Sequence, residues 1–503
     1  MKNLIVCCDG TWNSEDDRDG GVPVPTNVVR LFNAVEDADA TGNPQLKYYH
    51  PGVGTDGGWI KRLWDGGVGA GLNRNVMSAY RWLGAHYAPG DRMFIFGFSR
   101  GAFTARSLGG MISKCGLLDL RGLPENQAWS RVKSVYQKGY RSSVQPAWDK
   151  SWFYPGTGPD GKIPIYFLGV WDTVGALGIP DDMGILDLLD FPSNYRFHDT
   201  ELGANVMHAR HAVALDEKRA SFTPTLWSNL KSHSDAKQVW FPGVHSDVGG
   251  GYVQKGLSDG ALKWMMDEVA PLGLALKPAM RDQPKPDFQD VLHDSATGAF
   301  KFFKTLPRNI PSFSPLTGAN DLHPSATDRH SSPPIVQAAY HPTILLKPGE
   351  KQTVTIFAKE HWNETGIYLE SGAQYRFQAS GEWLDQSIPC GPNGVGTGFH
   401  IAYLIADAWA LGVKAFRAST GKKGAKRGMR REEGARWFAL VGAIANDGNP
   451  QNYGTPQPFE SFVIGNGCNY RIDKPGYLYC FANDLWKFYG NNRGSVALTV
   501  ERL

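Results

Sequence analysis

The sequence predicts an α/β fold, in which a mostly parallel sheet is flanked by helices, followed by a C-terminal antiparallel β-sandwich. In the first two thirds of the chain, short apolar runs ending in polar or Gly-rich turns alternate with segments of helical periodicity, as in strand–helix–strand units. From residue 343 onward, short β-rich runs are separated by Gly and Asn turns, which is typical of a sandwich. Because 503 residues are too many for one ordinary core, we assign residues 1–340 to the α/β domain and residues 341–503 to the sandwich.

The composition is that of a globular protein and excludes several functional classes. Hydrophobic residues make up 42% of the chain and charged residues 20%, and the formal net charge of +3 is nearly neutral for this length, so we expect no nucleic-acid partner. The six cysteines are scattered and form no CxxC pair, which argues against a disulfide framework. The apolar run at the N-terminus is too short for a signal peptide, and no stretch approaches the ~20 apolar residues that span a bilayer. We therefore expect synthesis in the cytoplasm and any export without a cleaved signal.

The first predicted strand, residues 3–8, ends in a polar loop that begins with Asp9, Gly10 and Thr11. A loop after a parallel strand lies at the carboxyl edge of the sheet, where α/β active sites form. A backbone N–H of Gly10 or Thr11 can therefore donate to an oxyanion. The alternative is that Asp9 only caps a turn.

The remaining elements of this domain follow from periodicity and turn chemistry. We predict helices over residues 27–35, 75–86, 205–214 and 257–269, strands over 163–170 and 237–244, loops over 14–25 and 48–58, and a lid over 176–200.

Residues 93–110 carry the strongest functional signal in the chain. An apolar strand, a Gly-x-Ser-x-Gly turn at Gly97, Ser99 and Gly101, and a helix follow one another. This context makes a serine nucleophilic, because the turn lifts its hydroxyl off the sheet and the helix N-terminus behind it stabilises negative charge. We therefore predict that Ser99 is a nucleophile and that the Arg100 N–H donates to the oxyanion, with a solvated serine on a Gly-rich turn as the alternative.

An acid and a base follow two further predicted strands, in the order expected for a hydrolase triad. Asp172 follows the strand predicted over residues 163–170, and His245 follows the strand predicted over residues 237–244. The order Ser, Asp, His predicts that Asp172 orients His245, with Asp247 as the alternative acid. His208 and His211 are predicted to be structural. A different arrangement stays open, in which four residues form a metal cluster as in a metallophosphatase: Asp9, Asp172, His245 and Asp247.

Four motifs together resemble the α/β-hydrolase lipase effectors of bacterial type VI secretion systems. They are DGTWN at 9–13, GVGT at 52–55, GFSRGAFTAR at 97–106 and GVHSDVGGGY at 243–252. By motif position, the resemblance implies that Ser99, Asp172 and His245 are catalytic and that no metal is needed for catalysis. It also implies glycerophospholipid substrates in a membrane, delivery into a rival cell, and contacts with secretion-apparatus and immunity proteins.

The C-terminal stretch FANDLWKFYGNNRGSVALTV, residues 481–500, is similar to the end of small calcium-dependent galactose-binding lectins. The resemblance implies a structural Ca²⁺ held by the side chains of Asp484, Asn491 and Asn492 and by backbone carbonyls at Phe488 and Asp385. These residues otherwise serve as turn residues of a sandwich. The stretch from Lys414 to Arg431 carries eight Lys or Arg and no acid, which suits either a solvated loop or a contact with anionic lipid.

The function we predict is hydrolysis of acyl esters of membrane glycerophospholipids by a Ser-Asp-His triad, with antibacterial action. We expect the sandwich to dock the enzyme on a sugar-bearing or anionic membrane surface. Two alternatives stay open. One is a carboxylesterase that acts on acylated glycans or small esters. The other is a carbohydrate-binding protein with an inactive hydrolase core.

Overall fold

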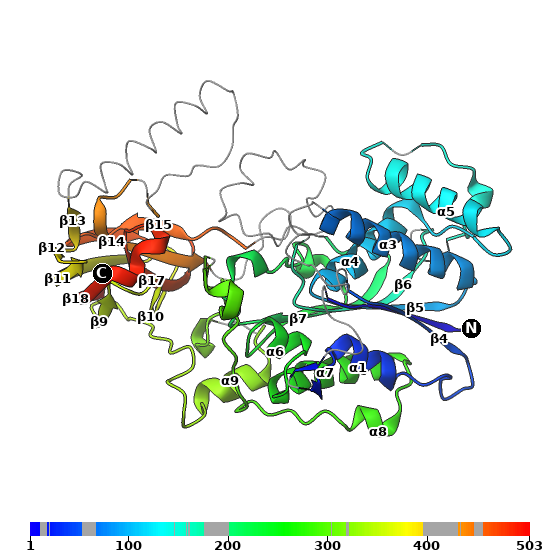
Figure 1. Cartoon of the computed structure of the whole chain (residues 1–503), viewed down its shortest axis with the longest axis horizontal. Coiled ribbons are helices and arrows are strands. Elements are labelled where there is room, and N and C mark those ends of the chain that lie inside the picture. The colour runs from blue at the N-terminus through cyan, green and yellow to red at the C-terminus, as the bar shows by residue number, and fades with distance from the viewer. Residues whose placement is uncertain are drawn as a thin grey trace.

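The protein is described by a computed structural model in which an α/β body and a β-sandwich lie side by side (Figure 1). The structure describes residues 1–10, 18–19, 21–52, 67–144, 146–156, 158, 161–175, 201–302, 304–317, 321–395, 431–432, 434–446 and 456–503. No helix among these residues is long and apolar enough to cross a membrane.

The α/β body is built on a six-stranded sheet in which all neighbouring strands are parallel. In spatial order the strands are β4 (Gln45–His50), β1 (Asn3–Cys8), β5 (Arg92–Phe98), β6 (Ile165–Trp171), β7 (Val206–Ala214) and β8 (Ala236–Phe241). Because β1 is followed in the chain by β4 on one side and by β5 on the other, the order of connection reverses at β1. The carboxyl ends of β1 and β5 therefore flank the crevice where α/β proteins place their ligands.

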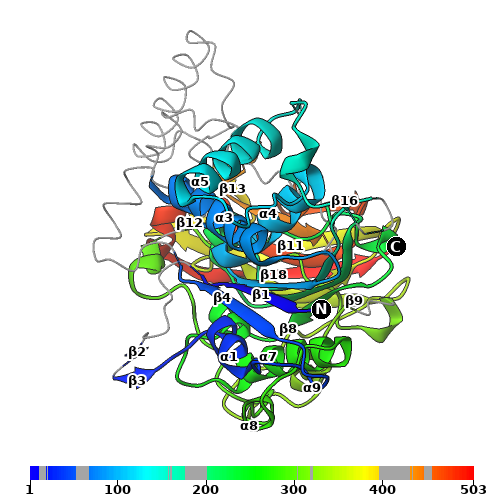
Figure 2. The ribbon, with the colours of Figure 1, turned by 90° about the vertical axis from the view of Figure 1, so that its right-hand side faces the viewer.

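Helices cover both faces of the sheet (Figures 1 and 2). Leu4 and Val6 of β1 pack against the face covered by α3, α4 and α5, and Ile5 and Cys7 pack against the face covered by α1, α6 and α7. This is why β1 is buried throughout rather than alternating. The α-helices are α1 (Asn27–Ala34), α3 (Gly67–His86), α4 (Arg100–Cys115), α5 (Glu125–Ser134), α6 (His245–Gly249), α7 (Gly256–Val269), α8 (Pro278–Arg281) and α9 (Pro324–Ser331).

Short elements complete the connections of the two bodies. The π-helix is η1 (Val135–Tyr140), and β2 (Arg18–Asp19) pairs with β3 (Val22–Pro23). The 3₁₀ helices are η2 (Lys150–Trp152), η5 (Ala220–Phe222), η6 (Leu230–Ser232), η7 (Ala270–Leu272), η8 (Gly298–Phe302), η9 (Pro315–Thr317) and η11 (Trp486–Asn491).

The sandwich consists of two antiparallel sheets that enclose one apolar core. One sheet contains β10 (Asn363–Leu369), β17 (Gly476–Ala482), β14 (Trp437–Asn446), β13 (Asn393–Val395) and β15 (Glu460–Val463). The other contains β12 (Ile388–Cys390), β11 (Gln374–Asp385), β18 (Asn492–Arg502), β9 (Lys351–Phe357) and β16 (Gly467–Arg471). Strands β14 and β17 are buried on both faces, because their outer face packs on the α/β body and on Trp362.

Val395 and Arg431 are the described residues on either side of residues 396–430, and both are attached to the sandwich. Val395 pairs with Trp437 of β14. The Arg431 guanidinium lies 3.5 Å from the centre of the Phe481 ring and 4.2 Å from that of Trp362, and it donates to the Tyr489 hydroxyl at 2.8 Å. Both points of attachment are therefore firmly held.

The predicted α/β fold with a C-terminal sandwich is confirmed, and three local predictions are wrong. Within the predicted loop over 14–25, β2 and β3 pair as short strands. Residues 206–214 form strand β7 and not a helix, because two parallel neighbours pair with a run whose alanines and histidines gave no clear period. Residues 48–50 belong to strand β4 and not to a loop. The predicted lid over 176–200 lies outside the described residues, as do residues 396–430, which contain most of the basic stretch.

Candidate active site

Ser99 lies on a strained turn between β5 and α4. Its φ of 57° is in the left-handed region that a non-glycine residue rarely adopts, and its N–H donates to the Trp171 carbonyl at 3.1 Å. A Cβ on Gly97 would overlap the backbone of Gly101, and a Cβ on Gly101 would overlap the carbonyl oxygens of Cys8 and Asp9. The two glycines thus allow strand, helix and the loop after β1 to meet at the serine.

The predicted acid and base lie against each other. His245 Nδ1 is 2.5 Å from Asp172 Oδ2, and both side chains are buried. The imidazole lies between the rings of Phe98 and Phe222, whose centroids are 4.6 and 4.9 Å away. Since Phe98 immediately precedes Ser99, the imidazole is placed beside the turn. Nδ1 is occupied by Asp172, so Nε2 is the nitrogen left for the serine, although no Ser99–His245 hydrogen bond is among the contacts of the described residues.

Arg308 is a partner of the acid that sequence reasoning missed. Its Nη1 is 2.6 Å from Asp172 Oδ1 and its Nη2 is 2.9 Å from Oδ2, and the Ala214 N–H donates to Oδ1 at 3.0 Å. Burial opposes ionisation of Asp172, but the Arg308 guanidinium and the His245 ring hold the pKa of this carboxyl well below its usual range. Burial also lowers the pKa of His245, against the opposing effect of Asp172, so the imidazole is neutral near pH 7 and can accept a proton.

The loop after β1 is held by Asp9, whose role goes beyond a simple cap. Asp9 Oδ2 accepts from the hydroxyls of Thr26 and Tyr49 at 2.7 and 2.9 Å, and Asp9 Oδ1 accepts from the Gly10 N–H at 2.7 Å. The Gly10 amide is therefore engaged by its neighbour, and Thr11 lies outside the described residues. Arg100 is the first residue of α4, where N–H groups point out of the helix end. Its role as an oxyanion donor, like those of Gly10 and Thr11, stays a prediction.

Asp247, the alternative acid, orients a different histidine. Its Oδ1 lies 2.6 Å from His293 Nδ1, and its Oδ2 accepts from the Val244 N–H at 3.0 Å. Asp9 and Asp172 have the separate partners given above, and the described residues contain no group of three or more His, Cys, Asp or Glu side chains able to hold a metal ion. The contacts thus favour a hydrolase arrangement over the metal cluster.

The two histidines of β7 support the structure around the acid. His211 Nε2 accepts from the N–H of Thr173, next to Asp172, at 3.2 Å, and burial lowers the pKa of His211 to about 3. His208 Nδ1 lies 2.5 Å from Asp235 Oδ2.

The predicted calcium ligands of the sandwich come together at one end of β18. Asp385 and Asn492 are register partners in β11 and β18, and Asn491 Nδ2 donates to Asp385 Oδ1 at 3.3 Å. Asp484 Oδ2, Asn491 Oδ1 and Asn492 Oδ1 are buried without a hydrogen-bond partner in the described structure. Burial raises the pKa of Asp484 to about 6, and the nearby charge of Asp385 adds to this effect. Unpartnered carboxylate and amide oxygens are what Ca²⁺ coordinates, so the side chains fit the ion.

Phe488, predicted to contribute a carbonyl, lies in η11 between these residues, and its ring is 54% exposed. An exposed ring is consistent with a residue whose backbone, rather than its side chain, serves the site.

Comparison with known proteins gives one family match and one curated relative. The family described as T6SS, phospholipase effector Tle1-like, catalytic domain, matches residues 2–268. The chain is 34% identical over 247 residues to the uncharacterised protein YEL023C of Saccharomyces cerevisiae, covering 44% of this chain and 32% of the yeast protein. The chain thus spans about a third of the length of that relative.

Three solved structures are also similar to the chain. A crystal structure of an uncharacterised protein from Pseudomonas aeruginosa has 20% identity and a TM-score of 0.32, covering 56% of this chain and 47% of that one. The Tle1 effector bound to the VgrG spike of the type 6 secretion system has 19% identity and a TM-score of 0.28, covering 50% and 52%. The N-terminal domain of EclA, a PllA-like lectin, has 18% identity and a TM-score of 0.19, covering 30% and 95%.

Proposed function

The chain belongs to the family of type VI secretion Tle1-like phospholipase effector catalytic domains, and from this premise we propose that it is a serine hydrolase of glycerophospholipid acyl esters. The observation that carries the proposal is the buried Asp172–His245 pair beside the strained turn of Ser99. A neutral histidine held by a carboxylate at Nδ1 is oriented to accept a proton at Nε2.

The reaction follows from these positions. His245 Nε2 takes the Ser99 hydroxyl proton as Oγ attacks the ester carbonyl, and Asp172 stabilises the imidazolium. The N–H of Arg100, with one N–H from the loop after β1, stabilises the oxyanion. The lysolipid alkoxide leaves with the proton from His245, and an acyl-enzyme remains. Water, deprotonated by His245, then releases the fatty acid and restores Ser99.

Substitution of the nucleophile tests this proposal. Ser99→Ala should lower turnover of phospholipid vesicles and of a soluble short-chain ester by on the order of 10³-fold or more. Ser107→Ala, on the same helix and equally buried, should leave turnover unchanged. Mass spectrometry of products from defined phospholipids and acetylated glycans identifies the substrate class. A folded Ser99→Ala variant with wild-type turnover refutes the nucleophile, and activity confined to glycans establishes the carboxylesterase alternative.

Family membership also supports a proposal about delivery. We propose export by a type VI secretion apparatus into neighbouring bacteria, with a spike component as carrier and an immunity protein in the producing cell. A competition assay between a producer and a susceptible strain tests this. Killing that depends on both the apparatus and Ser99 supports delivery, whereas killing without the apparatus contradicts it.

We further propose that the sandwich holds a structural Ca²⁺ between Asp484, Asn491 and Asn492, with carbonyls of Phe488 and Asp385. The three unpartnered buried oxygens support this site, and the ion would supply their missing partner. Calcium should raise the Tm of the full chain by mass action, and Asp484→Asn should abolish the rise. Asp473→Asn, at an exposed residue of the same domain, should keep it. A calcium-independent Tm in the wild-type protein contradicts the site.

The expected docking of the sandwich on a sugar-bearing or anionic surface stays a proposal. Vesicle sedimentation of the full chain, with and without calcium and with neutral or anionic lipid, is its test. Binding to anionic vesicles that high salt removes supports a role for the basic stretch. Failure to bind lipid or immobilised galactosides in any condition contradicts docking.

A further inference from the structure

Residues 304–313, here called the strap, run between the α/β body and the sandwich. Arg308 of the strap is almost fully buried, and its guanidinium contacts four acceptors. Two are the carboxylate oxygens of Asp172, and the others are the carbonyl oxygens of Ala214 and Phe222 at 2.7 and 2.8 Å. One side chain thus ties the catalytic acid to the ends of two further segments. The planar guanidinium is suited to such a fork in a way that lysine is not.

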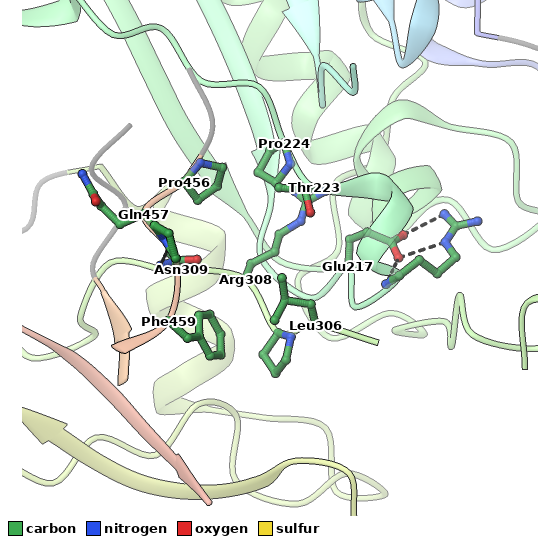
Figure 3. A pocket seen from close by; sticks show the side chains of 12 residues that line it. Glu217, Thr223, Pro224, Leu306, Arg308, Asn309, Pro456, Gln457 and Phe459 are labelled. Atoms are coloured by element: carbon green, nitrogen blue, oxygen red, sulfur yellow. Dashed lines mark hydrogen bonds and ion pairs between the residues drawn. The ribbon is translucent and has the colours of Figure 1, made fainter. Parts of the chain in front are cut away.

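The next residue, Asn309, forms hydrogen bonds with the backbone of the sandwich. Its Nδ2 donates to the carbonyl oxygens of Asn446 and Gln457, the second at 3.1 Å. Figure 3 shows the two side chains leaving the strap in opposite directions, Arg308 toward Thr223 and Pro224, and Asn309 toward Gln457. Two consecutive residues therefore bind different bodies: Arg308 binds the Asp172 carboxylate of the α/β body, and Asn309 binds the backbone of the sandwich.

The rest of the strap is held by both bodies. The Leu306 N–H donates to the Lys218 carbonyl of the α/β body at 2.7 Å, and further contacts reach the sandwich. The Phe313 N–H donates to the Tyr477 hydroxyl at 3.0 Å, and Trp362 Nε1 donates to the Thr305 carbonyl at 2.9 Å. Ile310 and Phe313 are buried in a core that both bodies share. The sandwich thus contacts the strap both before and after Arg308.

A cavity of about 210 Å³ lies beside Arg308, so packing does not hold the strap on that side. Its walls come from both bodies, with Thr223 and Pro224 on one side and residues 456–459 on the other (Figure 3). Besides its own four contacts, Arg308 is therefore held by hydrogen bonds of neighbouring strap residues, of which those from Asn309 are the nearest along the chain.

We propose that Arg308 is a positioning residue for Asp172. We further propose that the sandwich helps to hold Arg308 in place through the hydrogen bonds that its backbone accepts from Asn309. The inference rests on the proposed Ser-Asp-His mechanism. The sandwich then contributes to catalysis, since the Asn309 side of the strap is fixed by the sandwich and Arg308 is the next residue. Loss of Arg308 leaves the charge of Asp172 to act on His245 alone, which stabilises the imidazolium.

The pH profile of kcat/KM on a soluble ester separates positioning from stability. Arg308→Gln should lower kcat/KM by about 10–100-fold and move the acid limb to higher pH by about one unit, because a protonated His245 is inactive. Arg308→Lys keeps the positive charge, so its acid limb should lie close to that of the wild-type protein. Its kcat/KM should stay below the wild-type value, because lysine cannot form the same fork. The other charged or titratable groups around the pair are Glu217, Arg219, His211 and Arg106, and all stay unchanged.

A matched pair of asparagines tests the strap. Asn309→Ala should lower kcat/KM by about 3–10-fold and, like Arg308→Gln, shift the acid limb of the pH profile to higher pH. Asn363→Ala removes an equivalent Nδ2 that donates to two carbonyls, those of Phe357 and Cys480, inside the sandwich, and should leave the kcat/KM of the folded protein unchanged. Arg210→Gln, at a buried arginine paired with Glu268 and Asp235 away from the site, controls for the loss of a buried ion pair in Arg308→Gln.

The outcomes distinguish this inference from the proposed function. If Asp172→Asn leaves activity intact, the triad itself is wrong. If Asp172→Asn is inactive but both Arg308 variants are folded with wild-type rate and pH profile, positioning by Arg308 is refuted. If Asn309→Ala behaves as Asn363→Ala does, the sandwich does not act through the strap.

Discussion

The Asp172 carboxylate contacts two side chains of different kinds, besides the Ala214 N–H. The Arg308 fork fixes the carboxylate in place and keeps it ionised, while His245 uses the remaining hydrogen-bonding capacity of Oδ2. A carboxylate so held cannot rotate away when the imidazole becomes charged. The geometry therefore suits an acid that orients its histidine without accepting the proton.

Comparison of two aspartates tests this assignment at the residue scale. Asp172→Asn should lower kcat by up to about 10⁴-fold, because the amide favours the wrong tautomer of His245. Asp247→Asn should cost less than about tenfold, since Asp247 contacts His293 and the Val244 amide instead. Steady-state kinetics on a soluble ester measures both. The reverse ranking would transfer the role to Asp247.

The sequence predicted Ser99, Asp172 and His245 as site residues but not Arg308. The first three each follow a strand that periodicity reveals, so their meeting at one sheet edge could be expected. Arg308 lies in a Pro-rich segment without clear period, for which we predict no helix or strand, and it reaches the acid across the fold. An arginine in the apolar run LPRNIP was the one available signal, and it names no partner.

At the scale of elements, the approach of α4 to the end of β1 depends on Gly101. Gly101→Ala should abolish ester turnover and lower stability by about 2 kcal/mol or more, because the new methyl group must displace the carbonyls of Cys8 and Asp9. Gly260→Ala in α7 has open space around it and should be neutral or stabilising by about 0.5–1 kcal/mol.

Thermal unfolding and turnover, measured on both glycine variants, check this expectation. An active and stable Gly101→Ala protein would show that the loop after β1 can move away at little cost.

The element predictions succeeded where burial and period agreed. β1 and α7 are found within one residue of their predicted ends, since β1 is an apolar run and α7 has a clear helical period. β7 was missed because its helix-compatible residues are forced into a strand by pairing with β6 and β8. Such pairing is a property of the assembled sheet and is not carried by the segment itself.

At the scale of the whole molecule, the two bodies share a core. Val213, Leu215 and Trp240 of the α/β body pack in one cluster with Tyr477 and Tyr479 of the sandwich. The boundary near residue 340 thus separates an α/β architecture from a sandwich, but the two bodies are packed against each other. We expect the full chain to unfold in a single calorimetric transition, and a chain cut after residue 340 to aggregate. Two well-separated transitions would contradict this expectation.

An ion pair at the same junction adds a pH dependence. His341 Nε2 lies 2.8 Å from Asp216 Oδ1; although burial opposes both charges, the pKa of Asp216 is lowered and that of His341 is raised. The Asp216 contribution is lost as pH falls through its lowered pKa, and the His341 contribution is lost as pH rises through its raised pKa. The pair therefore stabilises the fold most in mildly acidic solution, between the two.

His341→Gln should accordingly lower stability by about 3 kcal/mol near pH 5.5 and by less near pH 9. His330→Gln, whose ring contacts the Tyr340 carbonyl oxygen and not a carboxylate, serves as the control. Chemical denaturation at both pH values measures the difference. An equal loss of stability at pH 5.5 and at pH 9 would show that the His341–Asp216 pair is not ionic.

The two fixed ends at Val395 and Arg431 have a consequence for how this protein can change in evolution. The entropy of closing a flexible connection between fixed points grows only logarithmically, by about 0.6 kcal/mol for each doubling of length. Val395 is held by strand pairing and Arg431 by aromatic rings, so a Gly- and Ser-rich connection put in the place of residues 396–430 would join two anchored ends. Doubling the length of such a connection should therefore lower the free energy of unfolding of the sandwich by only about 0.6 kcal/mol, so the chain can grow at this position without loss of the fold.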